Sequence, residues 1–388
     1  MRSVELFAGA GGLAMGMSAA GFEHAAVVEW DHDACETFRD NQRSRFPAVG
    51  GWPLHECDVR DFDYGALGEV AVVSGGPPCQ PFSLGGKHRA YNDKRDMFPE
   101  AVRAARELRP RAFVFENVKG LMRGSFAEYF EYVILQLAHP SVTRKTAEPW
   151  RQHRVRLERH HTSRGERAEY NVVFRLLNAA DYGVPQRRER VFIVGFRSDL
   201  GVRWSFPEAS HSEDALLRSQ WVTGEYWDRH GVARGKMPPG APSLPRLARL
   251  REGTLFDFGK QPWVTVRDAI GDLPEPAIHR DNGVTNHKLN PGARRYPGHT
   301  GSPLDGPAKT LKAGDHGVPG GENMLARPDG SVRYFTVREA ARLQTFPDGY
   351  SFRGAWTEAM RQLGNAVPVR LAETVARSVA SALTFAAD

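Results

Sequence analysis

A cysteine in a stiff turn is the residue of this sequence best suited to covalent chemistry. Cys79 stands in SGGPPCQPFS, where Pro77, Pro78 and Pro81 remove backbone donors and restrict the backbone. The segment follows the apolar run VAVV, so the pattern predicts a strand that ends in a rigid turn. A thiol held in this way is either a nucleophile or a packed, inert side chain.

A carboxyl group is expected beside this thiol. Glu116 ends the apolar run AFVFE, and the carboxyl ends of parallel strands meet at one edge of a sheet. We therefore expect Cys79 and Glu116 at adjacent strand ends, facing one crevice. A nicotinamide reaction needs no such pair, whereas activating an electron-poor aromatic ring toward a methyl donor does.

A glycine-rich turn after the first apolar run indicates a nucleotide-like ligand. In ELFAGAGGLAMG, Gly9, Gly11 and Ala14 fit the Gly/Ala form of the dinucleotide-binding spacing, and a helical pattern follows. Glu29, about 20 residues on, is placed to bind ribose hydroxyls, and Trp30 offers a face for an adenine ring. The alternative is a tight turn that binds nothing.

Alternating β-rich and helical patterns predict a doubly wound α/β sheet to position these groups. The expected strands are 4–7, 25–30, 70–74, 112–116, 170–177 and 190–196. The expected helices are 12–20, 33–42, 97–108, 335–346, 356–364 and 367–385. From about residue 197 proline becomes frequent and periodicity is lost, which predicts an irregular inserted domain. We expect a catalytic and cofactor-binding domain at 1–197 plus 333–388 and a second, irregular domain at 198–332.

Composition narrows the class of protein without deciding it. The 388 residues hold 52 Lys and Arg against 46 Asp and Glu, a net charge of +6 that suits a nucleic-acid partner but is common elsewhere. Three cysteines are too few for a disulfide framework or a zinc site, and no metal is expected. Without an apolar run long enough to cross a bilayer, we expect no membrane partner and a cytoplasmic location. The Arg-rich segment 141–168 is either a solvated loop or a phosphate contact.

The motifs FAGAGG, VVEWD, GGPPCQPFS, ENV, QRRERVFIVG, RLQTFP and GNAVP resemble, in their order, those of the cytosine-C5 DNA methyltransferases. The ordered set covers nearly the whole chain outside the irregular domain. The resemblance implies a Rossmann-like sheet that uses S-adenosyl-L-methionine, with an inserted, irregular target-recognition domain. It implies DNA (cytosine-5-)-methyltransferase activity on double-stranded DNA, in a restriction–modification system or as a solitary modifier.

The resemblance also implies roles for individual residues. The Cys79 thiolate would attack C6 of a flipped-out cytosine, while Glu116, kept protonated by burial, would act as an acid. Arg188 would reach the flipped base or its phosphate, and Arg190 would support Glu116 and the cytosine O2. The cofactor-binding residues would be Phe7, Ala8, Gly9, Ala10, Gly11, Gly12, Glu29, Trp30, Asp58, Val59, Pro78, Asn365 and Ala366, with Asp58 accepting from the adenine amino group.

Two loops are expected to contact DNA. In the loop after Cys79, the candidates are Gln80, Ser83, Lys87 and Arg89. In segment 307–325 they are Lys309, Thr310, Lys312 and His316, although a loop without function is the alternative.

Several alternatives stay open at this point. A relative on the same scaffold could methylate tRNA, although the long inserted region favours DNA. A Rossmann-like binding protein or a nicotinamide oxidoreductase would share the glycine turn but would not need Cys79. We expect a monomer associated with the nucleoid through DNA, with a cognate restriction endonuclease as a further partner.

Overall fold

A computed structural model defines the fold of residues 1–78, 96–165, 167–233, 237, 241–252, 259–278, 283–314 and 321–386. The predictions made for Cys79, Gln80, Ser83, Lys87, Arg89 and His316 lie outside these residues. The chain divides into two compact units. Unit 1 comprises Met1–Leu177, Glu189–Pro207 and Ala372–Asp388, and unit 2 comprises Asn178–Arg188 and Glu208–Leu371.

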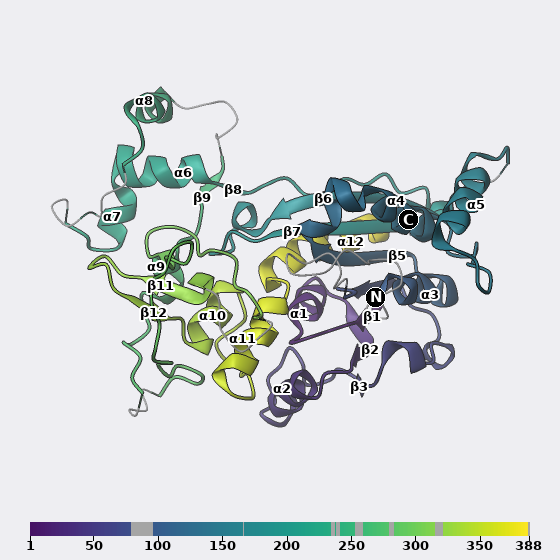
Figure 1. The fold of residues 1–388 in the computed structure, drawn as a ribbon, viewed down its shortest axis with the longest axis horizontal. Helices are drawn as coiled ribbons and strands as arrows, with labels where there is room; N and C mark the ends of the chain where they lie inside the picture. Colours follow the sequence, from purple (N-terminus) through teal and green to yellow (C-terminus); the bar gives the residue numbers. More distant parts are fainter. Residues whose placement is uncertain are drawn as a thin grey trace. The chain divides into compact units, whose positions relative to one another are not determined.

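Unit 1 contains a seven-stranded sheet with the order β3-β2-β1-β4-β5-β7-β6 (Figure 1). Its strands are β1 (Arg2–Leu6), β2 (Glu23–Glu29), β3 (Leu54–Glu56), β4 (Val72–Gly75), β5 (Ala112–Val118), β6 (Tyr170–Asn178) and β7 (Glu189–Arg197). Pairing is parallel from β3 to β5, and β7 runs antiparallel to β5. The central strands are buried along their length because both faces of the sheet are covered. The predicted α/β fold is confirmed.

The helices of unit 1 include two that the periodicity did not predict. They are α1 (Gly12–Ala19), α2 (His32–Arg43), α3 (Phe98–Leu108), α4 (Ala127–Ala138), α5 (Trp150–Thr162) and α12 (Val369–Phe385), the last from residue 372 onward. Helices α4 and α5 were missed. Helix α5 lies in the segment 141–168, so the interpretation of that segment as a loop was wrong. Aromatic contacts with α4, rather than a continuous apolar stripe, hold α5 in place.

Unit 2 is built from short elements, as the proline-rich sequence predicts. Its helices are α6 (Glu213–Arg218), α7 (Glu225–Arg229), α8 (Leu244–Glu252), α9 (Val266–Ile270), α10 (Val337–Leu343) and α11 (Trp356–Asn365). Its strands are β8 (His211–Ser212), β9 (Gln261–Pro262), β10 (Ser302–Pro303), β11 (Met324–Ala326) and β12 (Val332–Tyr334). A small core gathers Ala180, Leu216, Tyr226, Trp227 and Trp263.

The structural division differs from the expected one at three places. Residues 198–207 belong to unit 1, whereas we expected them in the target-recognition domain. Residues 178–188 and 333–371, including α10 and α11, pack with unit 2, whereas we expected them in the catalytic domain. Sequence periodicity identified these helices but carries no information about which core they join. Among the described residues, no helix is both long and apolar enough to cross a membrane.

Candidate active site

The turn after β1 has the backbone conformation that its glycines allow. Gly9 and Gly11 have φ of 53° and 86°, and Phe7 also takes a positive φ of 55°. A Cβ at Gly9 would have no described heavy atom within 4 Å, whereas one at Gly11 would stand 2.7 Å from the Phe38 ring. Gly9 therefore leaves open space over the turn, and Gly11 lets the turn pack against α2.

Glu29 at the end of β2 holds this turn in place. Its Oε2 accepts a hydrogen bond from the Gly9 amide at 2.6 Å, and its Oε1 accepts from the amides of Trp30 and Asp31 at 3.0 and 2.8 Å. Burial raises the pKa of Glu29, and these three bonds oppose the rise. A carboxylate has about four acceptor positions, so one remains for a ribose hydroxyl.

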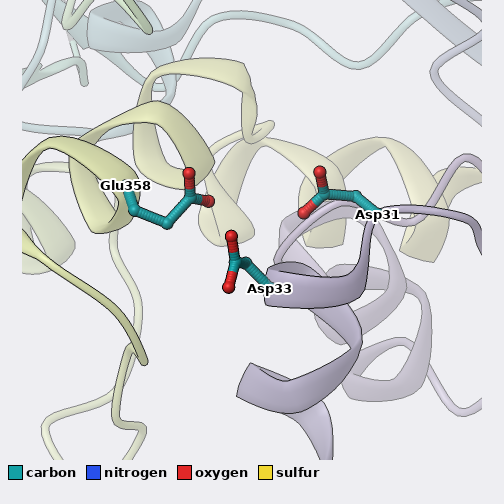
Figure 2. A group of neighbouring side chains, drawn as sticks. All are labelled: Asp31, Asp33 and Glu358. Carbon is teal, nitrogen blue, oxygen red and sulfur yellow. The ribbon is translucent and has the colours of Figure 1, made fainter. Parts of the chain in front are cut away.

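The residues that follow Glu29 leave an aromatic face open. The Trp30 side chain is 69% exposed, as a platform for an adenine ring requires. Helix α2 then begins. Asp31 caps it by accepting from the Ala34 amide at 3.0 Å, and Asp33 lies in its first turn (Figure 2).

The Asp58 carboxylate already accepts intramolecular hydrogen bonds, which the sequence did not indicate. Its Oδ1 accepts from the backbone amide and the Nε of Arg60, both at 2.9 Å, and its Oδ2 pairs with the same guanidinium. Arg60 holds the pKa of Asp58 below its usual range. The next residue, Val59, is buried. The contact of Asp58 with an adenine amino group stays a prediction.

The carboxyl ends of β4 and β5 bring Glu116 beside the turn that leads to Cys79. A Cβ at Gly76 would lie 3.3 Å from Glu116 Oε2. Asn117 donates from Nδ2 to the Pro77 carbonyl at 2.9 Å and so ties β5 to this turn. The sequence motif ENV contained Asn117, but its role was missed because it depends on contact with a distant backbone carbonyl.

Glu116 forms a buried ion pair with Arg190 on β7. The Nε of Arg190 lies 2.8 Å from Glu116 Oε1, and both side chains are nearly inaccessible to solvent. Burial lowers the pKa of Arg190, and the charge of Glu116 opposes this. An adjacent guanidinium favours an ionised carboxylate. The side chain is therefore buried, as expected, but beside a cation, and its protonation at the moment of attack stays a prediction.

Arg188 occupies a different environment from Arg190. Its fully buried side chain donates to the carbonyl oxygens of Leu311 and Gly364 at 3.0 and 2.7 Å within unit 2. Gln186 is also buried and accepts from the Leu311 amide at 3.0 Å. The geometry makes Arg188 a positioning residue for two backbone segments, rather than the direct base contact we expected.

The remaining predicted residues lie in unit 2. Asn365 is exposed at the end of α11, and Ala366 follows it as a buried cap. Thr310 donates its hydroxyl to the Arg187 carbonyl at 2.7 Å, Lys309 Nζ donates to Thr300 at 2.8 Å, and Lys312 pairs with Glu322 at 2.8 Å. All three DNA-contact candidates therefore have intramolecular partners in this structure.

Comparison with known proteins decides the family. The model of the C-5 cytosine-specific DNA methylases matches residues 1–139 and 158–381. The chain belongs to this family. It is 30% identical to the type II methyltransferase M.NgoMIV of Neisseria gonorrhoeae, over 98% of this chain and 97% of that protein. It is 31% identical to the type II methyltransferase M.Eco47II of Escherichia coli, over 97% of this chain and 78% of that protein.

A solved structure agrees at the level of the fold. A prophage-encoded DNA modification methyltransferase of Escherichia coli matches with a TM-score of 0.59 at 20% identity, over 99% of both chains. The present chain is thus a DNA cytosine methyltransferase that uses S-adenosyl-L-methionine. The glycine turn, with its open space at Gly9, the Glu29 carboxylate and the exposed Trp30 ring, fits an adenosine-bearing cofactor.

The two other thiols of the methyltransferase do not compete with Cys79 as nucleophiles. Burial raises the pKa of Cys35 to about 12 and also raises that of Cys57. Both are therefore protonated near neutral pH, and the protonated thiol is not the nucleophile.

A buried carboxyl group in the sheet predicts a pH-dependent stability. Glu5 on β1 accepts a hydrogen bond from the Ser74 hydroxyl, and burial raises its pKa to about 8. The folded state therefore holds this proton more tightly than the unfolded chain. The stabilisation is complete below about pH 4.5 and is lost as pH rises to about 8. Glu5→Gln should remove this dependence, which is on the order of 5 kcal/mol for a pKa that rises from 4.5 to about 8.

Urea unfolding at several pH values between 5 and 9 measures the effect. The unfolding free energy of the wild type should fall relative to Glu5→Gln across this range. Glu23→Gln, at the exposed start of β2, is the matched control and should follow the wild type. Parallel curves for the wild type and Glu5→Gln would contradict the prediction.

Proposed function

We propose that this methyltransferase modifies C5 of a cytosine in one specific duplex DNA sequence, through a covalent bond between Cys79 and C6, within a restriction–modification system. The buried pair of Arg190 and Glu116, beside the turn that leads to Cys79, is the observation that supports it most. This arrangement leaves a carboxyl group oriented at the strand edge where the thiol is expected.

The reaction begins with attack on the ring. The Cys79 thiolate bonds to C6, and a proton passes from the Glu116 carboxyl to N3, so that the ring accepts the electron pair. Because Arg190 favours the ionised form of Glu116, the carboxylate takes up this proton from water before the thiolate attacks. Arg190 thereby orients Glu116, while Asn117 holds the turn before Cys79.

Methyl transfer and release follow. S-adenosyl-L-methionine supplies an electrophilic methyl group on a positively charged sulfur. Held by the glycine turn, Glu29 and Trp30, the cofactor would supply this methyl group to C5 and leave as a neutral thioether. A base then removes the C5 proton, the N3 proton returns to Glu116 as the C6–Sγ bond breaks, and the thiolate and the aromatic ring are restored.

The surrounding residues take the supporting roles that the motifs predict. Phe7 to Gly12 with Glu29, Trp30 and Asp58 would bind the adenosine part of the cofactor, and Asn365 and Ala366 would complete its site. The loop with Gln80, Ser83, Lys87 and Arg89 would stabilise the extruded base, because a stacked cytosine hides C6. The recognition contacts would come from Lys309, Thr310, Lys312 and His316.

The relatives are named type II methyltransferases, which supports a cognate restriction endonuclease as a further partner. We also propose that the enzyme acts as a monomer.

Two measurements test the proposal together. With radiolabelled cofactor, we expect methyl transfer to duplex DNA from cells that lack the enzyme and none to tRNA. In duplexes made with 5-fluorocytosine, C5 carries no removable proton, so a covalent adduct should accumulate at the methylated position. Transfer only to tRNA would overturn the DNA substrate. Methylation of ordinary DNA without adduct formation would overturn the covalent step.

A further inference from the structure

We propose that helix α5 and the turns on either side of it form a surface that binds the phosphates of duplex DNA beside the methylated site. This α5 surface consists of Lys145, Arg151, Arg159 and Arg164. It would extend the contact between the enzyme and its substrate beyond the cytosine pocket and the recognition loops. The inference rests on the duplex DNA substrate of the proposed function.

Part of the segment that carries this surface lies outside the family match. The family match stops at residue 139 and resumes at 158, which leaves 140–157 unmatched, with Lys145 and Arg151 inside this stretch and Arg159 and Arg164 just after it. The unmatched stretch holds five Lys and Arg residues against one Glu, a net charge of +4, whereas the whole chain has +6. Positive charge that suits a polyanion is therefore concentrated in and just after the stretch that the family match leaves out.

Helix α5 is a firmly anchored platform rather than a solvated loop. The Trp150 ring packs edge-on to Tyr129, with centroids 5.9 Å apart, and Leu157 is fully buried. The two ring nitrogens of His153 hydrogen-bond to the Tyr132 hydroxyl and the Val142 carbonyl, both at 2.8 Å. Trp150, His153 and Leu157 lie on one face of the helix, so binding through the opposite face does not require the backbone to become ordered first.

The exposed part of this segment carries cations that the protein neutralises weakly or not at all. The Arg151 side chain is 73% exposed and forms an ion pair with the exposed Glu128 carboxylate at 3.6 Å. Among the residues that the structure describes, Lys145, Arg159 and Arg164 form no ion pair. By contrast, Arg154 and Arg156 of the same helix pair with Glu158 and Glu148 at 3.1 and 2.8 Å. These paired residues brace the helix, and the unpaired ones remain available to phosphate oxygens.

The α5 surface begins at the catalytic edge of unit 1. Arg151, in the first turn of α5, lies beside Glu128, in the first turn of α4, and the two helices lie side by side (Figure 1). Helix α4 follows β5, whose carboxyl end carries Glu116. Tyr129 of α4 also hydrogen-bonds Asp96, which follows the segment that begins at Cys79. DNA with its cytosine at this edge would present flanking phosphates to α5.

The salt dependence of DNA binding tests the inference. We compare the wild type with the triple variant Arg151→Gln, Arg159→Gln, Arg164→Gln, using a random-sequence duplex of about 40 base pairs, long enough to reach beyond a recognition site. Removing one phosphate-binding cation should reduce the slope of log K against log salt by about 0.9. We therefore expect a slope smaller by about 2 to 3, and roughly tenfold or greater weakening at low salt, with kcat at saturating DNA unchanged.

A matched control distinguishes the loss of the α5 surface from a general effect of lower positive charge on the protein. Arg43→Gln, Arg377→Gln removes two exposed guanidinium groups from α2 and α12 of the same unit, and it should leave the slope near that of the wild type. Equal slopes for the triple variant and the wild type would overturn the inference, as would a selective loss of tRNA binding. Either result leaves the proposed function standing if the variant still methylates DNA.

Discussion

Replacing Cys79 with serine should lower the rate constant for methyl transfer by roughly 10³-fold or more, since the covalent step depends on one nucleophile. A serine hydroxyl is far too weakly acidic to supply an anion near neutral pH, whereas a thiol, whose ordinary pKa is about 8.5, can. Cofactor binding should be almost unaffected, because the contacts proposed for the glycine turn and Glu29 do not involve this thiol. Single-turnover transfer of a labelled methyl group measures the rate, and calorimetry measures cofactor affinity.

Cys57→Ser provides the matched control for the thiol. Cys57 is partly buried, and burial raises its pKa, so it plays no part in the proposed reaction. Its variant should transfer the methyl group at a rate within a few-fold of the wild type. Retention of full turnover by Cys79→Ser would remove the nucleophile from the mechanism.

Glu116→Gln should lower kcat by about 10²- to 10⁴-fold, the usual contribution of a positioned acid or base. Glutamine fills the same space but cannot deliver a proton to N3. The substitution also leaves the buried Arg190 guanidinium without its carboxylate, and loss of one partner of a buried pair costs about 3–5 kcal/mol. A lower melting temperature should therefore accompany the loss of activity.

A neighbouring glutamate separates the chemical effect from the electrostatic one. Glu189 lies next to Arg190 in the sequence and pairs with Lys119 at 2.8 Å, but both side chains of this pair are exposed. Glu189→Gln should change kcat less than about twofold and the unfolding free energy by about 1 kcal/mol or less. If Glu116→Gln lost stability but kept its single-turnover rate, Glu116 would be a structural residue and not the acid.

The buried contacts of the two arginines show why the sequence predicted one site residue better than the other. In QRRERVFIVG, alternation places Arg188 and Arg190 on the same side of an extended chain. The structure instead assigns Arg188 to unit 2, where it binds two carbonyl groups, and Arg190 to unit 1, where it binds Glu116. Local spacing determines the side of an extended chain to which each side chain points. The groups that it hydrogen-bonds or pairs with come from segments far away in the sequence.

Helix α5 illustrates the same limit at the level of secondary structure. Its arginines and histidines mask the periodicity, because only Trp150, His153 and Leu157 are buried against the protein and one of these is polar. The helix forms because Tyr129 and Tyr132 of α4 offer ring faces and a hydroxyl group to it. Such tertiary contacts override weak local propensity.

The sequence by itself determined the order of the motifs, the glycine turn and the α/β sheet, because glycine conformation, proline rigidity and buried strands are local properties of the chain. Tertiary structure alone decided that α5 packs on α4, that Arg188 is buried against backbone carbonyls, and that α10 and α11 join unit 2. These outcomes depend on which side chains burial brings together, and the free energy of a buried charge or hydrogen bond depends on a partner that no local pattern specifies.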